Sequence, residues 1–235
     1  MKQWKYLEAI HHVEPVNFKV AYAFAAVPSR YLLENRLWKE AANLEPVHAN
    51  LSWEHYPWQK AVFVYTRLMG AVNTGDLPAA KLGFADLNRL HELLKAKDPY
   101  QANQVLIQIR SSEAWINFKE GNVTAAMQQM QVAADMEDKT GKHPVTPCEV
   151  LPQRELQGDL YMQLKDPVKA LQAYELNLAN NPGRFNGLYG AGIAAEKSGN
   201  IGKAKAYYAQ LVGGVDTSAA VRPEVALAKR YLETH

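Results

Sequence analysis

The sequence has only one cysteine, Cys148, and no long hydrophobic run. A single cysteine excludes an internal disulfide and a CxxC metal cluster. No apolar stretch approaches the roughly 20 residues that cross a bilayer, and the opening MKQWKYLEAIHHVEP lacks the apolar core of a secretory signal. We therefore expect no membrane partner and a cytoplasmic location, or a periplasmic one if the chain is a fragment of a longer exported protein.

An excess of charge of one sign is also missing. The 26 Lys and Arg residues nearly balance the 24 Asp and Glu residues, which leaves a formal net charge of +2. No block of basic residues is present that could follow a phosphate backbone, so nucleic acid is not an expected partner. The hydrophobic share of 48% over 235 residues is enough to bury a sizeable core.

Alternating hydrophobic patterns, which are typical of strands, are almost absent. Apolar residues recur instead at intervals of three and four, as in FADLNRLHELLKA (84–96) and QANQVLIQIRSSEAWINF (101–118). This spacing places apolar side chains on one face of a helix. The sequence therefore predicts an all-α fold.

A six-residue phrase recurs where one predicted helix gives way to the next. Four copies read GDLPAA (75–80), GNVTAA (121–126), KDPVKA (165–170) and GNIGKA (199–204), and a weaker copy, RLWKEA (36–41), precedes them. The recurrence predicts about five helix hairpins, each with the same kind of turn.

Each position of this phrase has a physical role. A leading glycine adopts at no cost the left-handed conformation that ends a helix. The Asp or Asn that follows is expected to accept a hydrogen bond from a free backbone N–H of the next helix. The final alanine lets two helices approach closely, and a larger side chain four residues later fills the space between hairpins. These larger residues are Phe84, Met130, Tyr174 and Tyr208.

Residues 151–184 resemble the tetratricopeptide repeat, a helix-turn-helix unit of 34 residues. Gly158, Tyr161, Ala170, Tyr174 and Pro182 fall in its register, and residues 185–218 follow in phase. From about residue 20 to 212 the chain resembles a family of bacterial tetratricopeptide-repeat proteins of undefined activity. The phrases that carry this likeness are RYLLENRLWKEAANLEP, HYPWQKAV, HPVTP and LPQRELQGDL.

The resemblance implies a right-handed α-α superhelix, a solenoid in which each hairpin buries its apolar face against its neighbours. We expect a single domain over residues 1–235, which is also compatible with the C-terminal part of a longer protein. The expected repeats cover about 15–45, 58–97, 100–138, 151–184 and 185–218, followed by a capping helix in 219–235. Two Pro-rich linkers, 45–57 and 138–152, interrupt them.

In such a stack the first helix of each pair lines the concave face, which predicts a ligand-binding groove. Its expected residues are Tyr65, Met69, Arg110, Ser111, Trp115, Phe118, Glu155, Asp159, Met162 and Tyr189. One interpretation is that a peptide lies against the aromatic residues while Glu155 and Asp159 hold a basic group. The alternative is that Trp115 and Phe118 belong to the core and that the two carboxylates are solvated.

These observations favour a non-catalytic scaffold that binds a protein or peptide and needs no cofactor. A homodimer, or a spacer within a longer protein, is a further partnership that the sequence allows. The alternative is a metal-binding or hydrolytic domain that uses the linker histidines His48, His55 and His143 with the groove carboxylates. These histidines show no HxH, HExxH or HxxxH spacing, so no motif supports that alternative.

Overall fold

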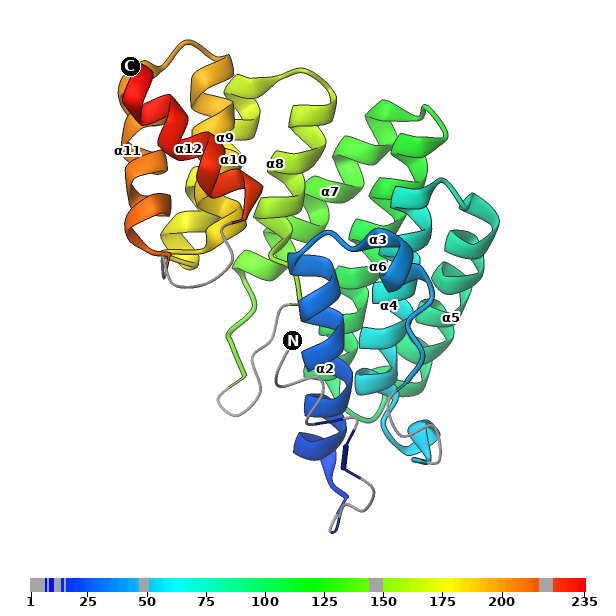
Figure 1. Cartoon of the computed structure of the whole chain (residues 1–235). Coiled ribbons are helices and arrows are strands. Elements are labelled where there is room, and N and C mark those ends of the chain that lie inside the picture. The colour runs from blue at the N-terminus through cyan, green and yellow to red at the C-terminus, as the bar shows by residue number, and fades with distance from the viewer. Residues whose placement is uncertain are drawn as a thin grey trace. The chain divides into compact units, whose positions relative to one another are not determined.

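The computed structural model describes residues 7, 9–10, 14, 16–46, 51–143, 150–215 and 222–235 (Figure 1). Across these residues it contains eleven α-helices, one short 3-10 helix and no strand. The all-α prediction is confirmed. The chain forms two compact units, Met1–Leu151 and Pro152–His235, and each is described by itself.

The first unit is a succession of helices in which each packs on the next. The first helices of neighbouring pairs also touch, because α2 contacts α4 and α4 contacts α6. The helices are α2 (Phe18–Glu34), α3 (Trp38–Ala42), the 3-10 helix η1 (Trp53–His55), α4 (Pro57–Thr74), α5 (Leu77–Lys95), α6 (Pro99–Lys119) and α7 (Val123–Asp138).

The second unit repeats this arrangement with shorter helices. Consecutive helices pack against one another, and α10 also contacts both α8 and α12. The helices are α8 (Gln153–Gln163), α9 (Pro167–Asn180), α10 (Phe185–Lys197), α11 (Ile201–Gly213) and α12 (Pro223–Thr234).

All five copies of the six-residue phrase begin with a left-handed residue. Gly75, Gly121 and Gly199 have φ angles of 89°, 84° and 76°. The two copies without glycine adopt the same conformation, with φ of 53° at Arg36 and 60° at Lys165. A left-handed backbone is unfavourable for a residue with a Cβ, so the packing on either side of these two turns must hold them in place.

The caps predicted at the second position form in three of the four strong copies. The side-chain oxygens of Asp76, Asp166 and Asn200 accept from the backbone N–H three residues later, at 3.0, 3.1 and 3.1 Å. Asn122 makes no such bond, and its amide donates to Asn117 Oδ1 at 3.4 Å instead. The cap prediction is therefore wrong at this one turn, where the side chain reaches back to the preceding helix.

The small-residue contacts lie inside the protein. Ala41, Ala80, Ala126, Ala170 and Ala204 are all 0% exposed. The larger side chains that follow are buried at positions 130, 174 and 208, whereas the one at position 84 is only partly buried. The repeated alanines thus mark close helix packing, as the sequence predicts.

Tyrosine rings of the second unit rest directly on glycines. A Cβ added at Gly158 would lie 2.6 Å from Tyr174 Cε1, and one added at Gly190 would lie 2.5 Å from the same atom. Tyr208 lies equally close to Gly192. Each ring therefore fills a space that exists only because the facing helix has no side chain at that point.

Candidate functional site

Four of the predicted groove residues are in the core of the first unit. Tyr65, Met69, Ser111 and Trp115 are between 0% and 2% exposed. The hydroxyls of Tyr65 and Ser111 share a buried hydrogen bond of 3.1 Å. These side chains are buried because α4 and α6 pack on each other and on α5, so the faces assigned to a ligand are used for packing. They offer no aromatic groove.

The other two groove residues of this unit are half-buried and already make contacts. Arg110 forms an ion pair with Glu113 one turn later, with 3.2 Å between Nη1 and Oε2. The Phe118 ring packs edge-on against Trp115 at a centroid distance of 6.0 Å. Their surroundings match the alternative interpretation, in which the aromatic residues stabilise the fold.

The two carboxylates predicted to hold a ligand are held by their own unit instead. Glu155 is 2% exposed and binds the Arg184 guanidinium at two points, with distances of 2.6 and 3.0 Å. Asp159 accepts a 2.7 Å hydrogen bond from the Tyr174 hydroxyl. The remaining predicted residues, Met162 and Tyr189, are half-buried hydrophobics packed on the core of this unit.

The two predicted histidines that the structure describes, His143 and His55, lie in different surroundings. His143 lies among three rings, with centroid distances of 6.3 Å to Phe18, 6.1 Å to Trp58 and 5.6 Å to Tyr100. His55 is an exposed residue of η1. His48 and Cys148 lie outside the described residues. Within the part of the chain that the structure describes, no group of three His, Cys, Asp or Glu residues could hold a metal ion.

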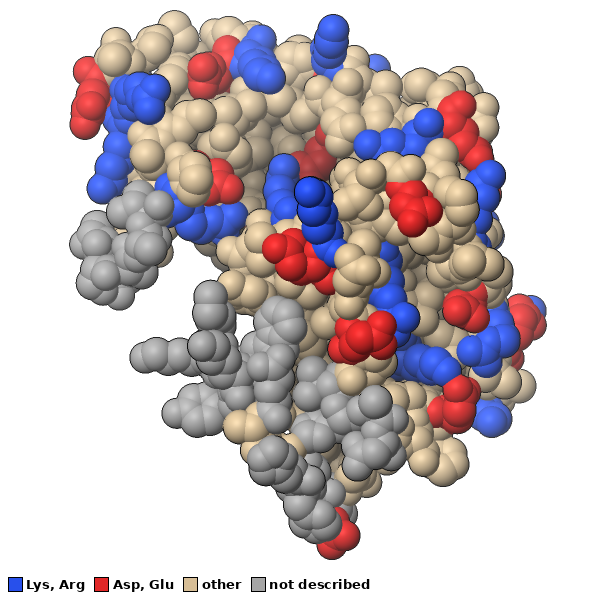
Figure 2. All heavy atoms as spheres, turned by 45° about the vertical axis from the view of Figure 1, so that its right-hand side comes forward, with Lys and Arg blue, Asp and Glu red and all other residues tan. Residues whose placement is uncertain are grey.

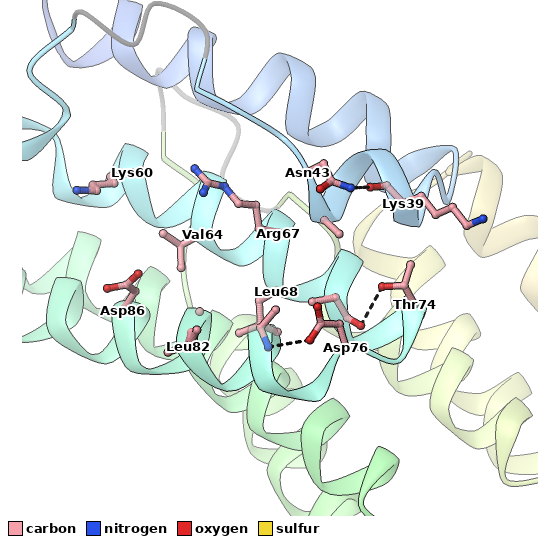
Figure 3. Close-up of a pocket in the computed structure, with 14 residues that line it drawn as sticks. Lys39, Asn43, Lys60, Val64, Arg67, Leu68, Thr74, Asp76, Leu82 and Asp86 are labelled. Atoms are coloured by element: carbon pink, nitrogen blue, oxygen red, sulfur yellow. Dashed lines mark hydrogen bonds between the residues drawn. The ribbon is translucent and has the colours of Figure 1, made fainter.

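A cleft of about 660 Å³ in the first unit is the strongest candidate site (Figure 3). Residues of α4 form one wall and residues of α5 the other, while the end of α3 closes one side. The lining consists of Lys39, Ala42, Asn43, Lys60, Val64, Arg67, Leu68, Ala71, Thr74, Asp76, Ala79, Leu82, Gly83 and Asp86. The sequence analysis did not identify this site.

The cleft begins where α3 ends. This helix has 5 residues, whereas the second helices of the later pairs, α5, α7, α9 and α11, have 19, 16, 14 and 13. The end of α3 sits directly on α4, because a Cβ added at Gly70 would lie 2.2 Å from Ala42 N. From that contact the lining continues along α4 to Lys60.

The walls of the cleft combine apolar and charged side chains. Leu82 is 72% exposed at its rim, and Val64 and Leu68 lie opposite on α4 (Figure 3). Arg67 is half-buried, and its Nε is shielded from solvent with no hydrogen-bond partner among the described residues.

The other charged side chains of the lining are already engaged or exposed. Lys60 forms an ion pair with Glu54. Asp76 accepts from the Ala79 N–H at the start of α5. Asp86 lies 3.7 Å from Arg89 on the surface. The cleft therefore combines three basic and two acidic side chains with one exposed large apolar side chain, Leu82.

A sequence signal for this site did exist. Lys60, Val64, Arg67 and Leu68 recur at helical spacing, which places them on one face of α4. The Pro at position 46 stops any helix that starts at Trp38 within a few residues, since proline cannot continue a helix. Together these features indicate a helix face left without its neighbour.

Basic and acidic side chains are interspersed over the face shown in Figure 2. None of the described helices combines the length and the apolar character needed to traverse a bilayer. Comparisons with protein-family models, curated proteins and solved structures found no match for this chain. The function is therefore inferred from the geometry of the chain itself.

Proposed function

We propose that this protein is a non-catalytic scaffold of the tetratricopeptide type, a right-handed helical solenoid that binds a segment of another protein. The five left-handed turns and the five fully buried alanines support the repeat. The binding site in this proposal is the cleft between α3, α4 and α5, rather than the concave groove expected from the sequence.

The observation that carries the proposal is the shortness of α3. The second helices α5, α9 and α11 have at least 13 residues and each packs on the helix that follows it, whereas the 5-residue α3 lies on the last part of α4. The lining of the cleft follows α4 from Lys60 to Ala71, a stretch of twelve residues or about 17 Å, which equals about three turns of helix. A helix from a partner would bury the exposed Leu82 on α5 and the half-buried Val64 on α4.

The cleft is too small for a permanent interface. Stable protein–protein interfaces bury about 1,200–2,000 Å² in total, and three turns of one helix bury less than that. We therefore expect a transient interaction with a dissociation constant in the micromolar range, equivalent to about 8 kcal/mol of binding free energy. Such affinities suit a scaffold that exchanges its partners.

A peptide library tests this proposal on the full chain. Displayed peptides of about 12 residues, the length that spans the cleft, are selected against the wild type and then tested against Leu82→Glu. Leu82→Glu places a charge on the apolar rim and should abolish binding. The matched control is Leu176→Glu, a change at an exposed leucine of α9 in the other unit, which should leave binding intact.

Both substitutions lie on exposed helix positions, so each should change the free energy of unfolding by less than about 0.5 kcal/mol. Circular dichroism and thermal unfolding check that the two variants remain folded. The proposal is refuted if no peptide is enriched, or if the enriched peptides bind Leu82→Glu as tightly as they bind the wild type.

A further inference from the structure

We draw no further inference here: the strongest candidate, the side-chain cluster of Phe18, Trp58 and Tyr100 around His143 where α2, α4 and α6 begin, carries nothing because its three rings already pack against the protein's own imidazole and nothing in the structure shows what would take its place.

Discussion

Replacing Gly190 with alanine tests the close packing that the repeat depends on. The new methyl group would lie 2.5 Å from Tyr174 Cε1 and Cζ, about 1 Å inside an ordinary contact between carbon atoms. The ring cannot move away, because it also packs closely on Gly158. A Cβ added at Gly158 would lie only 2.6 Å from Tyr174 Cε1. Its hydroxyl is also fixed by a 2.7 Å hydrogen bond to Asp159.

Two opposing contributions determine how much Gly190→Ala changes the free energy of unfolding. Alanine is favoured over glycine inside a helix by about 0.5–1 kcal/mol. Overpacking a rigid core costs about 1–3 kcal/mol, and here the clash involves an immobile ring rather than a flexible chain end. We therefore expect Gly190→Ala to lower the free energy of unfolding by about 1–2 kcal/mol.

Urea unfolding followed by circular dichroism measures this change as a lower midpoint with an unchanged slope. The control is Gly202→Ala in α11, where a Cβ would meet no atom within 4 Å, so the helix preference alone should raise stability by about 0.5–1 kcal/mol. Combining Gly190→Ala with Tyr174→Leu should cost less than the sum of the two single changes. An unchanged or raised stability in Gly190→Ala would refute the packing argument.

Three further changes test other parts of the fold. Lys165→Gly should raise the free energy of unfolding by about 1 kcal/mol in urea titrations, because glycine adopts a φ of 60° without strain. Glu155→Ala removes both hydrogen bonds between a buried carboxylate and the Arg184 guanidinium and should cost about 3 kcal/mol by the same titration, against less than about 1 kcal/mol for Lys203→Ala at an exposed ion pair. Burial and a hydrogen bond to a carboxylate raise the pKa of Tyr207 to about 12, above the ordinary value of about 10. Its unfolded form therefore loses its proton first, so stability falls between about pH 10 and about pH 12, and unfolding curves of Tyr207→Phe should show a smaller fall.

The all-α class and the turns between helices were predictable because a short local phrase determines each turn. The left-handed glycines, the caps at positions 76, 166 and 200 and the buried alanines all depend on interactions within a few residues or on a single close contact. Such features leave a direct trace in residue type. Even the turns at Arg36 and Lys165, which lack glycine, were located because the rest of the phrase is present.

The groove was not predictable in the same way. Residue type shows that Trp115 and Tyr65 lie on first helices, but not which side of such a helix is covered by a neighbour. In this unit α4 contacts α2, α3, α5 and α6, so almost every face of it is used for packing. The burial of a side chain on the first helix of a pair depends on how many neighbours that helix has. The sequence of one repeat does not contain this information.

The proposed site lies in the helix pair that differs most from the others. A repeat that is complete on every side buries its apolar surface and has nothing left with which to bind, as α4 demonstrates along most of its length. The pair that contains α3 differs from the others, because this second helix has only 5 residues and the cleft lies beside its end. The α5 wall of that cleft carries Leu82, which is 72% exposed and which a bound partner would cover in our proposal. The place to test for a partner is therefore the pair that departs from the common pattern, since the regular contacts elsewhere already bury their apolar residues.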